Sequence, residues 1–542
     1  MQSNPAPVPG KESARSPHPQ RRSCFGSFPS GSPSRESLPS GAPDPPPTYQ
    51  TLPNPCNRLG NLQGSGRAQG QLDVPSRLPA AGRLPHDCDR GRTPGSRVAS
   101  PSKSSGSRPH GDRSGAARRS ERGNRESNPP AGVRVVRRNQ TGYAFSDELS
   151  YSSLLDAARV ASSVVENQSR TNPIDVTRRN PPQPFTLQNP EPLMLEYTKF
   201  DLLQRMDAAA RGVDSRIVSV RIEYLDEVRD VLIGTSDGIY VLDRQYLASI
   251  TCAPAAQAGG KRGSGFSSMG GRVDADYFAR NSPEEAARQA ARQAIRLLEA
   301  GPAPAGPMPV VVAPGWGGVL IHESLGHALE GDGIRRGTSL LTGLVGTRIA
   351  SPLVRVVDDG RWPNGRGSCA VDDEGTPSQR TVAVEAGVLQ SYFLDKQNAV
   401  LLGLRSTGNG RRMSYRNWPI PRMTNTYLDA GTSDPASLLN GIARGFYAAE
   451  LGGGSVDTTS GNFNFAVREG YWIEDGRRTR PVRGAVLIGN SLETMKRIEG
   501  IGTDLVVEQS RGTCGKDGQM IPVGVGQPTV RFSSITVGGP SI

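Results

Sequence analysis

Two histidines, His322 and His327, flank Glu323 in the segment HESLGHALEGD. The chain of 542 residues contains only five histidines, and the other three lie among its first 128 residues. Neutral imidazoles hold Zn²⁺ or a similar ion, and a nearby carboxylate takes a proton from the water that the ion activates. The pattern therefore predicts a metal-dependent hydrolase; the alternative is a helix with one buried and one solvated histidine.

The spacing of five residues restricts the backbone between the two histidines. On a regular α-helix, at ~100° per residue, His322 and His327 would point about 140° apart, which is unsuitable for binding one ion. One extra residue in the turn, a π-bulge, would bring both imidazoles to one side, and such bulges occur frequently at functional sites. Gly326 is the residue best able to permit this distortion or a close approach of the backbone. We therefore expect a helix interrupted by a π-bulge.

The first 128 residues differ in composition from the rest of the chain. They are rich in Pro, Gly, Ser and Arg, and residues 1–130 contain 19 Lys and Arg against 9 Asp and Glu, which accounts for most of the net charge of +12. Such a segment cannot bury enough apolar surface to offset its ordering entropy. We predict that residues 1–128 are a disordered low-complexity tail, or the product of a mis-assigned start or a frameshift. The nearly neutral remainder has no basic patch interleaved with aromatic residues, which argues against nucleic acid as a partner.

The remaining residues predict an α+β fold in two domains. Residues 129–302 are expected to form an N-terminal α/β domain with an antiparallel sheet and long helices, and the Gly/Ser-rich segment 255–272 within it is expected to be flexible. Residues 303–542 are expected to form a predominantly β C-terminal domain that carries the metal-binding helix near its start. Short helices are predicted in this domain at 434–447 and 491–500.

The sequence has no segment that indicates a membrane or an exported protein. No apolar run is long enough to cross a bilayer, and none resembles a signal peptide. The six cysteines show no CxxC pairing, so a disulfide framework is not expected in a chain of this size. Cys252 and Cys369 lie in strand-like surroundings and are expected to pack in the core. These features are consistent with the cytoplasm and with no membrane partner.

The segment HESLGHALEGD resembles the H-E-x-x-x-H signature of the TldD/PmbA family, on its metal-bearing TldD side. Further segments are similar to the same family, namely DDEGTP at 372–377, TGNGRR at 407–412, PRMTNTY at 421–427, CGKDGQ at 514–519 and PVGVGQP at 522–528. The resemblance extends from about residue 132 to the C-terminus. Because family members begin with an additional strand and helix region, it also implies that the N-terminal domain is incomplete here.

The resemblance implies a metallopeptidase that cleaves unfolded or extended peptides. It implies one divalent metal ion, Zn²⁺, with His322, His327 and Cys514 as its ligands. It further implies a heterodimer with a metal-free PmbA/TldE-like paralogue. Glu323 is the candidate general base, because it adjoins a ligand and can reach the activated water.

Several other polar residues are candidates for supporting roles. Glu330 and Asp332 are candidates for hydrogen bonds to the imidazole N–H groups or for alternative ligands, and simple solvation at the helix end is the competing interpretation. Candidate substrate-binding residues would hold the backbone or a carboxylate of a peptide, although each is otherwise an ordinary polar loop residue; they are Asn409, Arg411, Arg412, Arg422 and Asn425.

Two other functions remain compatible with the sequence. A non-catalytic partner subunit of a peptidase heterodimer is one, and the intact set of His322, Glu323, His327 and Cys514 counts against it. A metal-dependent hydrolase of a non-peptide amide is the other, and the shared chemistry leaves it open. Binding of an extended peptide as an added strand would favour the peptidase.

Overall fold

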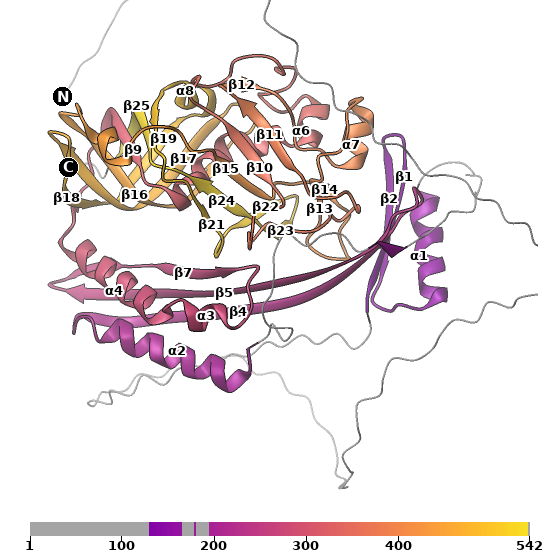
Figure 1. Cartoon of the computed structure of the whole chain (residues 1–542), viewed down its shortest axis with the longest axis horizontal. Coiled ribbons are helices and arrows are strands. Elements are labelled where there is room, and N and C mark those ends of the chain that lie inside the picture. Colours follow the sequence, from indigo (N-terminus) through magenta and orange to yellow (C-terminus); the bar gives the residue numbers. More distant parts are fainter. Residues whose placement is uncertain (1–128, 165–177, 180–193, 540–542) are drawn as a thin grey trace, which may run out of the picture. The chain divides into compact units, whose positions relative to one another are not determined.

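The computed structural model describes residues 129–164, 178–179 and 194–539 (Figure 1). The predicted tail at residues 1–128 lies outside these ranges. None of the helices within them combines the length and the apolar character that crossing a bilayer requires.

A hairpin and a helix begin the described chain. The strands β1 (Ala131–Arg137) and β2 (Gln140–Ser146) pair antiparallel, and α1 (Tyr151–Ser163) follows. The Ser150 side chain caps α1 by accepting a hydrogen bond from the Ser153 N–H.

A long antiparallel ribbon of β4 (Ile217–Gly234) and β5 (Tyr240–Ala258) forms the centre of the N-terminal domain. The helices α2 (Glu196–Arg211) and α4 (Pro283–Glu299) pack against this sheet (Figure 1). Each helix is amphipathic, and the buried faces of both meet β5 in one core cluster. That cluster includes Met206 and Ala210 of α2, Ala287, Ala291 and Ala294 of α4, and Ile250 and Cys252 of β5.

The segment 255–272, which we predicted to be flexible, belongs to this sheet. The strands β6 (Lys261–Ser264) and β7 (Ser267–Gly271) both pair with β5, which also pairs in parallel with β3 (Arg178–Arg179). A Cβ at Gly270, where φ is 134°, would lie 2.1 Å from the Ala248 carbonyl oxygen. The prediction of flexibility was wrong. The composition alone suggested a mobile segment, but such glycines permit close approach of neighbouring strands. The short helix α3 (Tyr277–Arg280) follows β7.

Two sheets account for most of the C-terminal domain. The eight-stranded sheet contains, in order, β16 (Arg444–Val456), β9 (Gly306–Val312), β25 (Val530–Gly538), β19 (Ala485–Asn490), β17 (Asn462–Glu474), β18 (Arg477–Arg483) and β8 (Gly301–Pro302), with β20 (Ile498–Ile501) paired to β25. The six-stranded sheet contains, in order, β12 (Val388–Leu389), β11 (Arg380–Glu385), β10 (Val356–Asp359), β15 (Asn425–Leu428), β24 (Gly524–Gln527) and β21 (Val506–Glu508). The largest core cluster draws on both sheets and on the histidine segment, as Val310, Val356 and Leu325 illustrate. The predicted α+β class with a β-rich C-terminal part is confirmed.

Short elements complete this domain. They are the hairpins β13 (Gly410–Arg411) with β14 (Ile420–Pro421) and β22 (Thr513–Lys516) with β23 (Gln519–Pro522), and the helices α6 (Gly331–Arg336), α7 (Lys396–Leu401) and α8 (Ser491–Lys496). The helix predicted at 434–447 was wrong, because only a 3-10 turn forms at Pro435–Leu439. Beyond it, β16 pairs with β9 and β17, and this tertiary pairing overrides the helical pattern of the segment. The helix predicted at 491–500 ends early, at Lys496.

Candidate metal centre

A glycine turn and a short distorted helix connect β9 to the two histidines. Gly315, with φ at 77°, starts a 3-10 turn that ends at Gly318, and α5 (Val319–Ile321) follows. Residues His322–Gly326 then form a π-helical turn, in which the His327 N–H donates to the His322 carbonyl five residues earlier. The predicted π-bulge is confirmed. Both imidazoles thereby reach one side of the helix, with ring centroids 5.1 Å apart and ring planes at 83°.

Gly326 has ordinary helical backbone angles, so its role lies in packing. A Cβ at this position would lie 2.1 Å from Sδ of Met423, which is fully buried. Gly318 plays a similar part at the start of the helix, where a Cβ would lie 2.4 Å from the backbone of Gly526 on β24. The two glycines allow the distorted helix to lie directly against Met423 and the six-stranded sheet.

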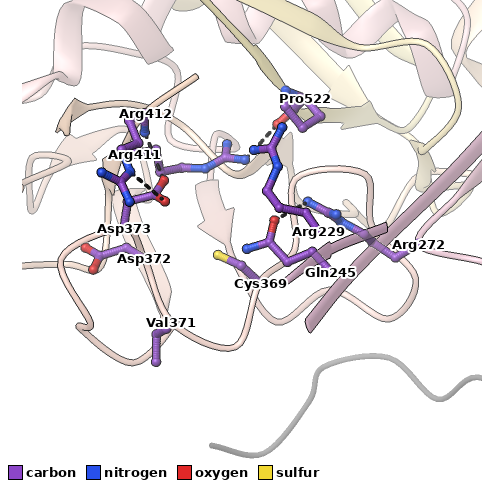
Figure 2. Close-up of a pocket in the computed structure, with 10 residues that line it drawn as sticks. All are labelled: Arg229, Gln245, Arg272, Cys369, Val371, Asp372, Asp373, Arg411, Arg412 and Pro522. Carbon is purple, nitrogen blue, oxygen red and sulfur yellow. Dashed lines mark hydrogen bonds and ion pairs between the residues drawn. The ribbon is translucent and has the colours of Figure 1, made fainter. Parts of the chain in front are cut away.

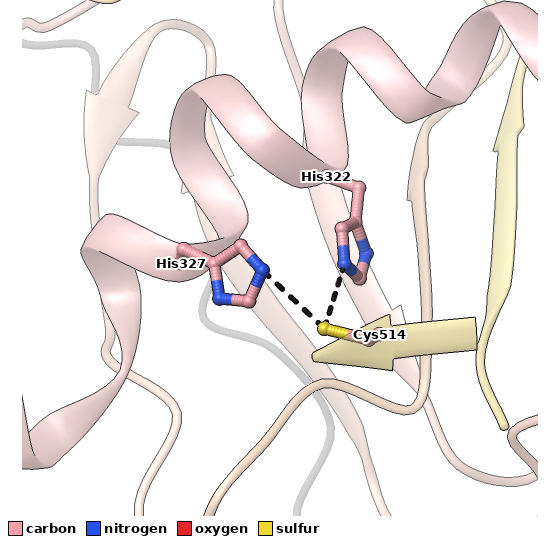
Figure 3. Close-up of side chains that lie close together, drawn as sticks. All are labelled: His322, His327 and Cys514. Carbon is pink, nitrogen blue, oxygen red and sulfur yellow. Dashed lines mark hydrogen bonds between the residues drawn. The ribbon is translucent and has the colours of Figure 1, made fainter. Parts of the chain in front are cut away.

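Cys514 lies on β22, nearly 190 residues further along the chain, and points between the two imidazoles (Figure 3). Its Sγ is 3.2 Å from His322 Nε2 and 3.3 Å from His327 Nε2, and the three potential ligand atoms all lie within 4.8 Å of one another. Burial alone would raise the pKa of the Cys514 thiol, but the charges and hydrogen bonds of His322 and His327 lower it to about 4. The arrangement therefore favours a thiolate between the rings.

The donor set fits a divalent ion. Two imidazole nitrogens and a thiolate suit Zn²⁺, whose catalytic sites keep three protein ligands and one open position. Around a tetrahedral ion with bonds of about 2.0–2.3 Å, such ligand atoms stand roughly 3.3–3.6 Å apart. The observed separations of 3.2 and 3.3 Å between Sγ and the two Nε2 atoms are close to that spacing.

Glu323 belongs to the same π-helical turn. Its Oε2 lies 3.8 Å from His327 Nε2, the nitrogen that faces Cys514. The Glu323 side chain is 22% exposed, whereas His322 and Cys514 are buried. The carboxylate therefore lies where the cluster meets solvent, a position from which it can accept a proton from water.

Glu330 is a buried carboxylate on the other side of His327. Its Oε2 lies 3.1 Å from His327 Nδ1 and 3.0 Å from Lys516 Nζ. Burial would raise the pKa of Glu330, but Lys516, His327 and Arg422 lower it to about 2. Burial opposes a charge on His327, yet Glu330 and Cys514 hold the pKa of this imidazole well above its usual value. A carboxylate on Nδ1 directs Nε2 of His327 toward Cys514.

Asp332 contacts cations and not the imidazoles. Its carboxylate lies 2.6 Å from Lys516 Nζ and 2.7 Å from an Arg336 nitrogen. Of the two acidic candidates at this helix end, Glu330 is therefore the one that contacts a histidine.

Four of the five candidate substrate-binding residues are buried. Arg422 donates to the carbonyls of Cys514 and Gln519, at 2.6 and 3.1 Å, and so supports the hairpin that carries Cys514. Arg411 donates to the carbonyls of Met423 and Pro522.

The two asparagines bind other buried groups. Asn409 donates to the Asp358 carboxylate, and Asn425 donates to the Asp359 carbonyl. Arg412 is the one candidate of the five that is not buried, and its guanidinium lies 3.5 Å from the Asp373 carboxylate and 3.3 Å from the Tyr143 hydroxyl. The structure thus brings these residues together around the hairpins β13–β14 and β22–β23.

Asp358 is a buried residue that binds several neighbouring side chains and that the sequence patterns did not identify. Asp358 lies within β10, and its carboxylate accepts hydrogen bonds from Asn409, Thr424 and Thr426. Val354, Val356 and Val357 precede it, interrupted only by Arg355, and they were the available signal for a buried strand that continues into the acidic pair.

The site combines three potential metal ligands with a partly exposed carboxylate, which are the side chains that a metal-dependent hydrolase uses. The sequence matches the PmbA/TldA metallopeptidase central domain over residues 190–298 and the C-terminal domain of the same family over residues 305–539. The chain belongs to the PmbA/TldD metallopeptidase family.

Individual relatives agree with this assignment. A protein described as "Metalloprotease TldD homolog" from Haemophilus influenzae is 41% identical over 415 residues, which cover 75% of this chain and 86% of the relative. A "Zinc metalloprotease TldD homolog" from Saccharolobus solfataricus is 33% identical over 249 residues, covering 46% of this chain and 55% of the relative. Among solved structures, TldE from Thermococcus kodakarensis has the same fold, with a TM-score of 0.61 at 20% identity over 76% of this chain and 94% of TldE.

Proposed function

We propose that the chain is a zinc-dependent peptidase that hydrolyses unfolded or extended peptides. The observation that carries the proposal is the convergence of His322, His327 and Cys514, whose ligand atoms lie within 4.8 Å of one another because of the π-helical turn. A bound Zn²⁺ would supply a Lewis acid that polarises a carbonyl and acidifies water. The name of the zinc metalloprotease relative supports this choice of metal.

Glu323 is the proposed general base. Its carboxylate lies 3.8 Å from the ligand nitrogen of His327 and at the exposed side of the cluster. From there it takes the proton of the attacking water and can return a proton to the leaving amine. Glu330 takes no proton in this scheme. It orients His327, and Arg422 holds the strand of Cys514 through two backbone carbonyls.

The five polar candidates divide into two proposed groups. Arg411 and Arg412 are proposed to bind the substrate, because both line one small cavity and Arg412 is not fully buried. Asn409, Arg422 and Asn425 are proposed to shape the site from within, since their polar atoms are engaged by other protein groups.

We further propose a heterodimer with a metal-free TldE-like paralogue. The shared fold with TldE, over 94% of that protein, supports a partner of similar architecture. Co-expression with such a paralogue followed by size-exclusion chromatography should give a one-to-one complex. Elution of both chains as separate species at micromolar concentration would contradict this part of the proposal.

The hydrolytic role is tested with an unfolded polypeptide and the zinc-loaded full chain, alone and with the partner. Glu323→Gln should retain zinc and lose cleavage, while Glu493→Gln, the same change at an exposed glutamate on α8, should leave cleavage unaltered. Cleavage by Glu323→Gln at the unmodified rate would remove Glu323 from the mechanism. Faster turnover of a small non-peptide amide than of any peptide would instead favour an amidase.

A further inference from the structure

A small cavity of about 20 Å³ lies near the β22–β23 hairpin, and its ten lining residues include four arginines and two aspartates (Figure 2). Arg229 comes from β4, Arg272 directly follows β7, and Arg411 comes from β13. Figure 2 shows their side chains converging on one space beside the Pro522 carbonyl. Arg229, whose side chain is 37% exposed, marks the outer edge of this space. The volume is on the order of one water molecule, so only the end of a polar group would enter it.

Two of these arginines are buried without a carboxylate partner among the described residues. Arg272 is 3% exposed and Arg411 is 6% exposed. Arg272 donates to the Tyr246 carbonyl and to the Gln245 side-chain oxygen, and its Nε has no hydrogen-bond partner. Arg411 donates only to backbone carbonyls. Buried positive charge with only neutral acceptors is unfavourable and would be offset by an anion.

The two aspartates that line the cavity already have partners. Asp373 pairs with Arg412, and the Asp372 carboxylate accepts from the backbone N–H groups of Glu374, Thr376 and Gly410. In Figure 2 the Asp372 carboxylate points away from the guanidinium groups.

Other nearby carboxylates compensate the positive charge only in part. Arg229 forms an ion pair with Glu227, and the Asp243 carboxylate accepts a hydrogen bond from the Gln245 side chain. Burial is the main cause that lowers the pKa of Arg272 to about 10; the charges of Arg411 and Arg229 act in the same direction, and those of Cys369 and Asp243 oppose them. Arg272 therefore remains charged at neutral pH.

We propose that this cavity binds a carboxylate. Guanidinium groups match the planar fork of a carboxylate, and the free Nε of Arg272 supplies an unused donor. The cavity adjoins the metal centre through the β22–β23 hairpin, because Pro522, whose carbonyl binds Arg411, pairs with Thr513 beside Cys514. Within the peptidase function proposed above, on which this step rests, the carboxylate is that of the peptide, either its C-terminus or an acidic side chain.

The test compares peptide binding to the zinc-loaded full chain carrying Glu323→Gln, which prevents turnover. One peptide sequence is used as the free acid, as the C-terminal amide, and with its acidic side chains replaced by amides. Thermal unfolding with sodium acetate against sodium chloride reports binding of a free carboxylate. Arg272→Lys keeps the positive charge but removes the planar guanidinium group with its paired N–H donors. Arg366→Lys is the matched control, since Arg366 is another buried arginine that donates only to backbone carbonyls and lies outside the cavity.

We expect one of the carboxylate forms to bind about ten-fold or more tightly than its amide, as charge-assisted hydrogen bonds allow. Arg272→Lys should abolish this ratio and Arg366→Lys should preserve it. Stabilisation by acetate that depends on Arg272, with equal binding of all peptides, would support the carboxylate site and assign it to a free anion. Equal binding of all peptides without any Arg272-dependent effect of acetate would overturn the proposal. If no peptide binds or is cleaved, the peptidase function fails, while the acetate measurement still decides the cavity.

Discussion

Replacing Gly326 by alanine should strain the metal centre from within. A Cβ there would lie 2.1 Å from Met423 Sδ and 3.0 Å from its Cε. Met423 is 0% exposed, so its side chain cannot move into solvent and has to shift within the core. Overpacking a buried site in this way costs about 1–3 kcal/mol. Because His327 directly follows Gly326, we expect a lower free energy of unfolding by that amount and weaker zinc binding.

Gly333→Ala is the matched control. Gly333 lies in α6, and its nearest neighbours to a Cβ, in Ser339 and Thr338, are 3.8 Å away. Alanine should therefore fit, and its better helix propensity should raise the free energy of unfolding by about 0.5–1 kcal/mol. Both variants are compared with the unmodified chain by urea unfolding in the presence of zinc, and zinc affinity is measured by competition with a chelator.

A double-mutant cycle isolates the contact with Met423. In a Met423→Ala background the sulfur is absent, so Gly326→Ala should cost at least about 1 kcal/mol less than it does in the unmodified chain. Equal losses in both backgrounds would refute the reasoning, as would a Gly326→Ala variant as stable as Gly333→Ala.

Three further predictions concern single side chains. Glu323→Gln should reduce kcat by about 10²–10⁴ with zinc content unchanged, measured by peptide hydrolysis and elemental analysis; loss of zinc would show that Glu323 acts on the metal site itself. Glu330→Gln should weaken zinc binding about 10–100-fold in a chelator competition, because a neutral amide oxygen is a weaker acceptor for His327 Nδ1 than the carboxylate; unchanged affinity would contradict the orienting role. Burial raises the pKa of Cys252 to about 12 and of Cys369 to about 11, so at pH 8 both thiols stay protonated. Mass spectrometry after iodoacetamide treatment at pH 8 should find neither alkylated in the folded chain, and modification of either at the rate of an unfolded control would contradict this.

The sequence predicted the backbone geometry between the two histidines, but not which residues from distant parts of the chain lie against them. The interval of five residues between His322 and His327 required an inserted residue in the turn, and the π-helical turn supplies it. The role of Gly326 was only half predictable, because the close approach is to Met423, a residue almost one hundred positions away. Cys514 entered through family resemblance alone, since no periodicity connects β22 with the histidine helix.

The wrong predictions have a common physical cause in long-range pairing. Segment 255–272 has the composition of a mobile linker, yet its backbone groups pair with β5 and its glycines fit against neighbouring backbone. Segment 434–447 begins with Asp-Pro-Ala-Ser-Leu-Leu, a start that favours a helix, yet Phe446 is buried where β16 pairs with β9. Arg272 lies in the first of these segments, so the proposed carboxylate-binding cavity could not be predicted without knowing how the strands pair.

The most direct test of the account is the zinc content of the purified full chain beside its His322→Ala, His327→Ala and Cys514→Ala variants, each checked for folding by circular dichroism. A three-ligand site predicts about one zinc per chain in the unmodified protein and loss of zinc in all three variants. A folded, unmodified chain that binds no zinc after incubation with the metal would contradict the account. Full retention of zinc by Cys514→Ala would likewise show that the thiolate is not a ligand.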